Sequence, residues 1–173
     1  MRGPYQILLP LLSLLLVRVD LTDLFPLSLE VKVAQVLDGD TLELSSGNYR
    51  FRLRLSRIDA PELDQPFLTG GAGAGELSRK CLSSILTGKG ILRLEAFDMY
   101  GRMLGDFNDV NLRMIRRGCA VLYPFAKFAS KREKSLYVLT QNSAKRKGLG
   151  IWEKGGILSP RKWRKFKKRR SSL

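Results

Sequence analysis

The chain has 173 residues, enough for one core and one domain, and its 31 lysines and arginines against 16 acidic residues give a net charge of +15, which attracts polyanions such as nucleic acid or an anionic membrane. It contains no histidine, so every mechanism that needs an imidazole as acid, base or metal ligand is excluded. Its two cysteines, Cys81 and Cys119, are too few for a disulfide scaffold or a Cys-rich zinc site, and we expect two small, buried, apolar side chains.

The N-terminus carries an apolar run, ILLPLLSLLLV at residues 7–17, behind a single arginine, Arg2. The run is shorter than the roughly 20 apolar residues of a membrane-spanning helix, and its length is typical of the apolar region of a secretory signal. An Ala-x-Ala cleavage site is missing, because the first alanine is Ala34. A cleaved signal, an uncleaved anchor and a buried strand therefore stay open. The pattern favours a secreted or membrane-associated protein, with a cytoplasmic location not excluded.

Alternating apolar side chains predict five strands. They are expected at residues 29–37, 41–44, 49–55, 91–97 and 102–107. The Asp-Gly-Asp sequence at residues 38–40 indicates a turn between the first two strands. Along the third strand, three apolar side chains face one way and three arginines face the other.

Three helices are expected, at residues 76–86, 109–118 and 130–147. The first has an apolar face at helical spacing, the second has Asp109 and Gly118 as caps, and the third is basic. The glycine-rich stretch at residues 69–75 is typical of a loop, and it lacks the lysine of a P-loop. Because strands and helices segregate along the chain, the sequence predicts an α+β fold with a small antiparallel sheet or barrel.

The C-terminal segment is strongly basic, since RKWRKFKKRR at residues 161–170 has eight lysines and arginines with Trp163 and Phe166 between them. It has no apolar face of useful width, so we expect a mobile tail. The tail is open to three interpretations: a solvated charge run, a phosphate-tracking arm with two stacking rings, or an anchor to anionic lipid. The expected organisation is an apolar segment at 1–28, one folded domain at 29–152 and a basic tail at 153–173.

Carboxylates cluster where the expected strands meet. Asp38 and Asp40 stand where the second strand begins, and Asp59 stands just after the third, so antiparallel pairing can bring them together. Oxygen ligands of this kind suit a hard cation such as Ca²⁺ or Mg²⁺, which would polarise a bound phosphate. Glu62 could orient or deprotonate a water, and Arg54 could grip the phosphate with its planar fork.

Strict alternation, however, places Arg54 and Asp59 on opposite faces of the strand. Both reach one site only if the strand bulges or ends near Ser56 and Arg57. Taken alone, the pattern is more typical of turn residues and surface charge than of catalysis, so a metal and phosphate site stays a hypothesis at this point.

The chain resembles the staphylococcal nuclease (thermonuclease) family in five stretches, which occur in the family's order and with similar spacing. They are VLDGDTLEL at 36–44, LRLSRIDAPELDQP at 53–66, DMYGRMLGD at 98–106, VNLRMIRRGCA at 110–120 and KGLGIW at 147–152. The resemblance covers residues 29–152. It implies a five-stranded OB-fold β-barrel with about three α-helices, and calcium-dependent endonuclease and exonuclease hydrolysis of DNA and RNA to products with 3′-phosphate ends.

The resemblance also implies a role for each acid of the site. Asp40 and Asp59 match the family's two metal-binding carboxylates, and Thr41 matches the residue that gives the metal a backbone carbonyl. Asp38 matches an outer acid near the ion. Glu62 matches the proposed general base.

Four further residues match the family's phosphate and nucleotide contacts. Arg54 and Arg102 match the two phosphate-binding arginines, with Arg102 on the far side of the site from Arg54. Tyr100 matches a tyrosine near the bound nucleotide. Tyr123 is the candidate for a second, stacking tyrosine, although it falls one position off in an ungapped match.

The chain departs from the family pattern at Ser56, Arg57 and Met99. None of the three is expected to touch the chemistry, and Arg57 is expected only to add positive charge beside the groove. An Arg57→Lys substitution should therefore do little.

Two other functions stay open. The first is a catalytically silent OB-fold module that binds nucleic acid without cutting it, although silent copies in the family lack acids or arginines that are all present here. The second is a membrane-tethered basic adaptor bound to anionic lipid. An all-oxygen site takes Ca²⁺ by the resemblance, with Mg²⁺ or Mn²⁺ not excluded. We expect a monomer, because no heptad seam is present.

Overall fold

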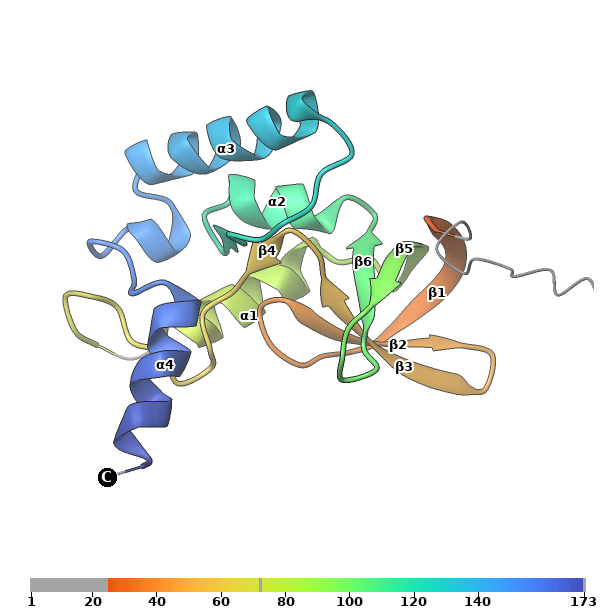
Figure 1. The fold of residues 1–173 in the computed structure, drawn as a ribbon, viewed down its shortest axis with the longest axis horizontal. Helices are drawn as coiled ribbons and strands as arrows, with labels where there is room; N and C mark the ends of the chain where they lie inside the picture. The colour runs from red at the N-terminus through yellow and green to blue at the C-terminus, as the bar shows by residue number, and fades with distance from the viewer. Residues whose placement is uncertain (1–24, 72, 173) are drawn as a thin grey trace, which may run out of the picture.

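The computed structural model describes residues 25–71 and 73–172, and within them a closed barrel forms one side of the molecule, on the right in Figure 1. Its strands are β1 (Leu27–Val36), β2 (Thr41–Ser46), β3 (Tyr49–Leu55), β5 (Lys89–Phe97) and β6 (Met103–Phe107), joined in the order β1-β2-β3-β6-β5. All neighbours are antiparallel except β3 and β6. The five predicted strands are confirmed, with every bound within two residues of the prediction.

A second, two-stranded sheet escaped prediction. It pairs β4 (Ile58–Asp59) with β7 (Val121–Leu122) in antiparallel fashion. Strands of two residues leave too short a pattern for alternation to be visible in the sequence. This small sheet matters for the site, because it holds Asp59 in place beside the barrel.

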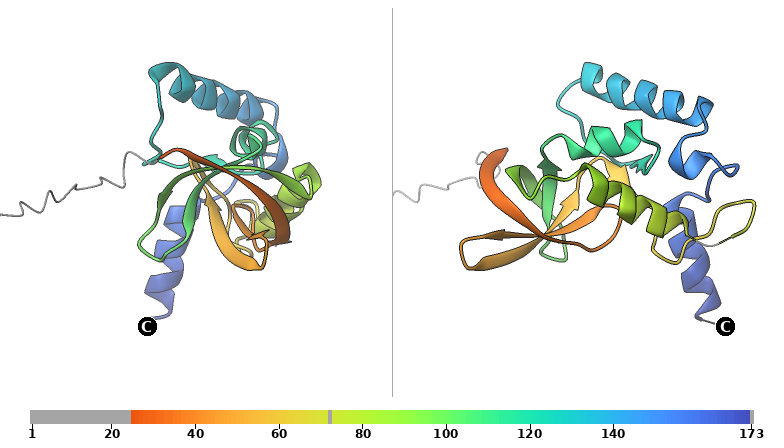
Figure 2. Two further views of the ribbon diagram at one scale, coloured as in Figure 1. Left: turned by 90° about the vertical axis from the view of Figure 1, so that its right-hand side faces the viewer. Right: turned by 180° about the vertical axis from the view of Figure 1, so that it is seen from behind.

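In the described part of the chain, the helical segments are α1 (Ala74–Ile85), α2 (Val110–Arg116), α3 (Lys131–Arg146), the 3₁₀ turn η2 (Gly150–Trp152) and α4 (Pro160–Arg170). α3 packs on α2, and α2 contacts α1 and β6. α4 projects from the end of the molecule opposite the β2–β3 hairpin (Figures 1 and 2). The α+β architecture, an OB-fold barrel with about three helices, is confirmed, and α4 is the addition.

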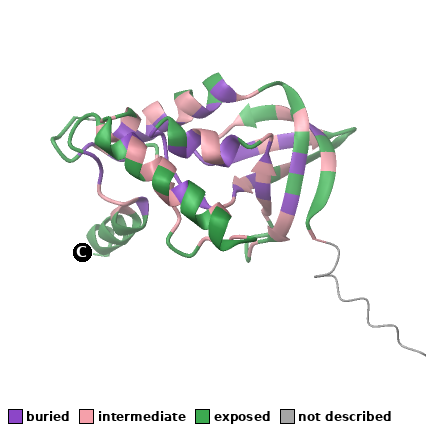
Figure 3. Cartoon of the chain, turned by 90° about the horizontal axis from the view of Figure 1, so that it is seen from above, coloured by how far each residue is buried: buried purple, intermediate pink, exposed green. Residues whose placement is uncertain are grey.

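The core fills the barrel as the alternation predicts. Leu42 of β2 pairs with Leu53 of β3, and these two and their neighbours Leu44 and Leu55 are fully buried. Buried segments, purple in Figure 3, run along the strands and the helices that pack on them. Burying each leucine contributes roughly 1.5–3 kcal/mol to folding. The arginines of β3 alternate with these leucines, and Arg54, the last of them, lies at the mouth of the barrel.

The expected C-terminal tail forms helix α4 instead. Pro160 occupies its first turn and is buried, and the helix continues to Arg170. Proline is favoured at this position because it has no N–H to leave unpaired and its φ already suits a helix. The Ser-Pro pair at residues 159–160 was therefore a helix-start signal within the sequence, and the basic composition of the segment obscured it.

The two cysteines are not free apolar side chains. Cys81 of α1 and Cys119, which follows α2, form a disulfide that closes a loop with a sequence separation of 38 residues. Two cysteines cannot make a disulfide-rich scaffold, but they suffice for one bond. The bond ties the two helices beside the barrel to each other.

The disulfide should contribute measurably to stability, because it restricts the unfolded chain. For a separation of 38 residues, the loop-closure estimate is about 3–4 kcal/mol. We expect a Cys81→Ala/Cys119→Ala variant to unfold at lower urea concentration than the wild type, and reductant to lower the midpoint of the wild type but not of the variant. A wild-type midpoint that is indifferent to reductant would contradict the bond.

Asp106 of β6 lies against the start of α2, where the Asn111 N–H donates to its carboxylate at 3.2 Å. Burial raises the pKa of Asp106 to about 6 from the ordinary 3.8. Because the folded state then binds the proton more tightly than the unfolded state, the contribution of this group is complete below about pH 4 and is lost as the pH rises through about 6.

We expect Asp106→Asn to be more stable than the wild type at pH 8 by about 1–3 kcal/mol, because the amide keeps the acceptor for Asn111 without a buried charge. The difference should vanish near pH 4, where the wild-type carboxyl is protonated. Urea unfolding at the two pH values measures it. A variant that is less stable than the wild type at pH 8 would show that the carboxylate is not strained by burial.

Candidate active site

The turn between β1 and β2 holds Asp38 and Asp40 at the mouth of the barrel. The Leu37 N–H donates to the Thr41 carbonyl at 3.0 Å, and the Asp40 N–H donates to the Asp38 carboxylate at 2.9 Å. The Asp40 carboxylate accepts in turn from the Ala60 N–H at 2.7 Å and from the Thr41 hydroxyl at 3.2 Å. Asp40 therefore joins the first turn of the barrel to the segment after β4.

The chain turns at the end of β3. Alternation along the strand predicted that Arg54 and Asp59 could reach one site only if the strand bulged or ended there. The strand ends at Leu55, and Arg57 has a φ of 67°, which turns the backbone before β4 begins. Because of this break near Ser56 and Arg57, Asp59 lies on the same side as Arg54. The strand therefore ends near Ser56 and Arg57, as it must for Arg54 and Asp59 to reach one site.

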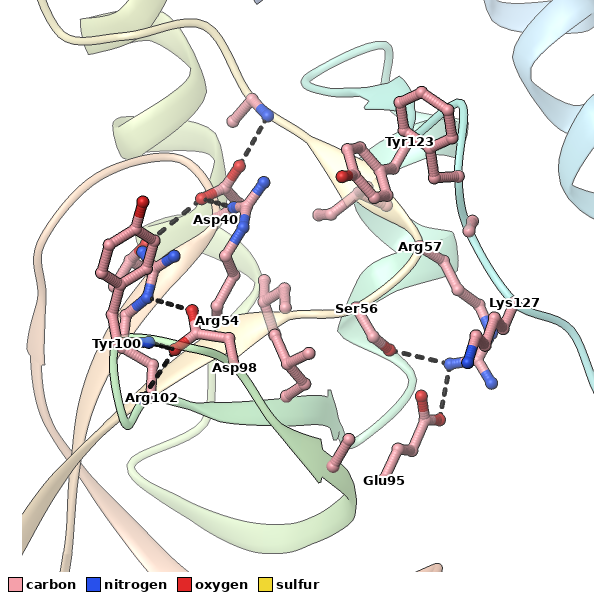
Figure 4. A pocket seen from close by; sticks show the side chains of 18 of the residues that line it. Asp40, Arg54, Ser56, Arg57, Glu95, Asp98, Tyr100, Arg102, Tyr123 and Lys127 are labelled. Carbon is pink, nitrogen blue, oxygen red and sulfur yellow. Dashed lines mark hydrogen bonds and ion pairs between the residues drawn. The ribbon is translucent and has the colours of Figure 1, made fainter. Parts of the chain in front are cut away.

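Arg54 bridges the two predicted metal-binding acids, and its pairing with Asp40 can be followed in Figure 4. One of its guanidinium nitrogens pairs with Asp40, and the other donates to Asp59 Oδ1 at 3.0 Å. Burial lowers the pKa of Arg54, but the charges of Asp40 and Asp59 outweigh this effect and raise it. Only 1% of Asp59 is exposed, and its burial raises its pKa although arginines contact it. One guanidinium thus holds two buried acids, one from the β1–β2 turn and one from β4.

Asp38 adds a third negative charge to this end of the barrel. Burial, followed by repulsion from Asp40, raises the pKa of Asp38 to about 6. Three acids at one place repel one another, so the arrangement favours bound cationic groups.

The turn between β5 and β6 forms another wall. Asp98 accepts from the backbone N–H groups of Tyr100 and Arg102, and the Arg102 side chain donates to it at 2.8 Å. The Arg102 guanidinium also lies over the Tyr100 ring, 5.7 Å from its centre. Arg102 therefore lies in the cleft wall beside Tyr100 and pairs with Asp98 (Figure 4).

Tyr123 follows β7 and supplies an aromatic wall. Its N–H donates to the Arg57 carbonyl at 2.8 Å, and its ring packs edge to face against Phe125, with the ring centres 5.7 Å apart. Phe125 is exposed, so this pair presents an apolar ring surface to the cleft.

These elements enclose an open cleft of about 1120 Å³, a size that suits a nucleotide-sized ligand. Eight predicted site residues line it, namely Asp38, Asp40, Thr41, Arg54, Glu62, Tyr100, Arg102 and Tyr123. Asp59 lies beneath Arg54. The structure thus brings all nine predicted site residues into one region.

Sequence reasoning missed Arg164 of α4. Its guanidinium donates to Glu62 Oε1 at 2.7 Å, and to the two oxygens of Asp59 at 3.2 and 3.0 Å. Burial lowers the pKa of Arg164, whereas the hydrogen bonds to Asp59 and Glu62 raise it, with a net rise. The composition singled out the basic segment, but nothing in it distinguished Arg164 from the neighbouring cations.

The expectation for Arg57 was wrong. Its side chain is buried, and it contacts Glu95 at 2.6 Å and Glu133 at 3.1 Å. The guanidinium also lies 5.9 Å from the centre of the Phe128 ring. Arg57 therefore connects the barrel to the first turn of α3. An Arg57→Lys substitution would disturb this connection and cannot serve as a neutral control.

The donor chemistry of the site fits a hard divalent cation. Asp40 accepts three hydrogen bonds, from Arg54, Thr41 and Ala60. A carboxylate offers roughly four lone-pair positions, so capacity remains for a cation. Across residues 25–71 and 73–172, no three His, Cys, Asp or Glu side chains form a ready-made metal cluster. Arg54 lies between the two central acids, and Arg164 contacts both oxygens of Asp59, so a cation would share these carboxylates with two arginines.

Comparison with known proteins places this site in a family. Residues 52–154 match the family model described as "Staphylococcal nuclease homologue". A protein of Haemophilus influenzae named "Uncharacterized endonuclease" is 32% identical over 143 residues, which cover 79% of this chain and 74% of that protein. A protein of the same name from Escherichia coli O157:H7 is 34% identical, with coverage of 77% and 83%. "Micrococcal nuclease" of Shigella flexneri is 28% identical, with coverage of 79% and 81%.

The chain belongs to the staphylococcal nuclease homologue family. The family and these relatives support a nuclease, a hydrolase that acts on nucleic acid. The resemblance seen in the sequence is thereby confirmed.

The two cleft arginines should differ from the other arginines of the chain. We expect Arg102→Lys to lower the turnover of DNA cleavage by more than about tenfold, because lysine cannot donate two parallel hydrogen bonds to a phosphate. Arg52→Lys is the matched control, since Arg52 is an exposed residue of β3 outside the cleft. Equal losses in the two variants would show that positive charge in general, and not a positioned side chain, is what matters.

Proposed function

We propose that this chain hydrolyses the phosphodiester bonds of DNA and RNA in a calcium-dependent reaction, as an endonuclease and exonuclease that leaves 3′-phosphate ends. The observation that carries the proposal is the Arg54 bridge between Asp40 and Asp59, with Glu62 close by in the same cleft. Mg²⁺ or Mn²⁺ would suit the same oxygen donors.

Each group of the cleft has a chemical role in this proposal. Asp40, Asp59 and the carbonyl of Thr41 would hold the cation, which would offset the negative charge of the phosphate. Glu62 accepts the proton of the attacking water. Arg54 and Arg102 donate to the phosphate oxygens, on which negative charge grows during attack.

The remaining features of the cleft suit recognition of the nucleic-acid backbone. The net charge of +15 attracts a polyanion, and contacts to phosphate carry little base information. The rings of Tyr100 and Tyr123 would stack on bases with little preference among them. Hydrolysis of both DNA and RNA is consistent with this set of contacts.

We also propose that the chain works in an oxidising compartment, as an exported or membrane-associated protein. The Cys81–Cys119 disulfide supports this location, because such bonds persist outside reducing compartments. The apolar run at residues 7–17, on which the expectation first rested, lies outside the described residues. Among the residues that are described, no helix has the length and apolar character needed to cross a bilayer.

Cleavage of plasmid and single-stranded DNA by the purified chain, with calcium or with a chelator, tests the function. We expect cleavage with calcium and none with the chelator. Asp40→Asn should lower turnover by at least about 10²-fold, because it removes an anionic ligand from a hard cation. The matched control is Glu153→Gln, which neutralises an acid outside the cleft.

Circular dichroism spectra of the variants should match that of the wild type, which checks that each variant is folded. Cleavage that persists in the chelator would contradict the metal mechanism. Tight binding of DNA without cleavage under any condition would instead identify a silent binding module.

A further inference from the structure

Helix α4 contributes a side chain to the cleft that the family resemblance, which ends at residue 152, did not cover. Arg164 contacts Glu62 and Asp59 at the same time, through two different nitrogens of one guanidinium. The planar fork of an arginine suits this arrangement, because its donors point in fixed directions toward two acceptors. The side chain is 42% exposed, so it reaches the acids from the rim of the cleft.

Several contacts fix α4 in this position. Asp64 accepts from the Trp163 ring N–H at 3.3 Å and pairs with Lys167, so the same acid holds two successive turns of the helix. The Arg161 guanidinium lies 4.8 Å from the centre of the Phe125 ring. α4 is therefore attached on both sides of Arg164 and forms a wall of the cleft.

The segment before α4 is fixed as well. Gln65 is fully buried, and its amide donates to the Leu158 carbonyl. The same side chain accepts from the Glu62 N–H at 3.3 Å. One buried amide thus connects the backbone of Glu62 to the chain that leads into α4, so Glu62 and Arg164 are placed by a common support.

The carboxylate of Glu62 contacts the Arg164 guanidinium. In the described part of the chain, Arg164 is the only side chain that hydrogen-bonds or pairs with this carboxylate. A general base must be aimed at the water whose proton it accepts, and a glutamate with several rotatable bonds loses that aim when nothing holds it. The second contact, to the nearly fully buried Asp59, fixes the guanidinium itself.

We propose that Arg164 is a positioning residue that holds the Glu62 carboxylate in its catalytic orientation. The inference rests on the proposed function, since it takes Glu62 as the base. At saturating cation, Arg164 acts through Glu62, so it affects the rate of the chemical step rather than the binding of the nucleic acid, whereas its contact with Asp59 would affect the binding of the cation. α4 is in this account a part of the active site and not an accessory arm.

A kinetic double-mutant cycle tests the proposal. We expect Arg164→Ala to lower kcat for a single-stranded oligonucleotide by about 10- to 100-fold with KM changed less than about threefold, since a misaimed base forfeits part of the usual 10²–10⁴ of general-base catalysis. Arg164→Lys should lose less, because lysine restores a contact to one acid. In a Glu62→Gln background, Arg164→Ala should have almost no further effect on kcat.

The control is Lys165→Ala, which removes the same charge from the next, exposed position of α4, outside the cleft. Its kcat should equal that of the wild type. If the fold-reductions in kcat of the two single variants multiply in the Glu62→Gln/Arg164→Ala variant, the proposal is overturned, because Arg164 then acts independently of Glu62. A higher kcat for Arg164→Ala would also overturn it and identify α4 as an inhibitory segment.

A second cycle, on melting temperature, is independent of activity. The Tm losses of Glu62→Ala and Arg164→Ala should not add in the double variant, because each removes the contact between the two side chains and that contact can be lost only once. Additive losses would show that the contact is not made in solution, and would overturn the proposal whatever the kinetics. If the Tm losses are not additive but the wild-type protein cuts no nucleic acid, the contact exists in solution and the proposed function is refuted.

Discussion

One partly buried guanidinium, that of Arg54, organises the candidate active site. Asp40 comes from the β1–β2 turn and Asp59 from β4, and their charges repel, so a cation between them stabilises their approach. Arg54 supplies that cation from the end of β3, at the position where the strand breaks. Removing a single partner of such a buried set leaves charges unpaired, which costs more than the set as a whole stabilises.

The rest of the cleft is built around this group of charges. The β1–β2 turn holds Asp40, the β4–β7 sheet holds Asp59, and α4 presents Arg164 to Asp59 and Glu62 from outside the barrel. Burial and the nearby charge of Asp40 raise the pKa of Asp38. The carboxylates of the site attract cations, and its arginines attract the phosphates of a polyanion.

The barrel could be predicted from the sequence because its strands are long enough for alternation to be visible. The contact between Arg54 and Asp59 could be predicted only as a condition. It required a break in the strand near Ser56 and Arg57, and the alternation of side chains does not reveal such a break. The family motifs assigned the acids and arginines, and the structure brings them together, all but Asp59 in the lining of the cleft and Asp59 through its contact with Arg54. What made the site predictable was therefore its short, local motifs.

The features that escaped prediction depend on tertiary contacts. The Cys81–Cys119 bond needs two helices to lie side by side, and neither cysteine's neighbours in sequence reveal this. Arg57 looked like a surface charge because its partners, Glu95 and Glu133, are distant in sequence. Arg164 was hidden among seven other cations of the same segment, and only the docking of α4 singles it out.

The central claim is that the acids joined by Arg54 form a divalent-cation site. Calorimetric titration of calcium into the wild-type chain and into Asp59→Asn, in the absence of nucleic acid, tests it most directly. The account predicts one calcium per wild-type chain and loss of that binding in the variant, because the buried carboxylate provides an anionic ligand that the amide lacks. Equal binding in the two proteins would contradict it, because the cation would then be held elsewhere.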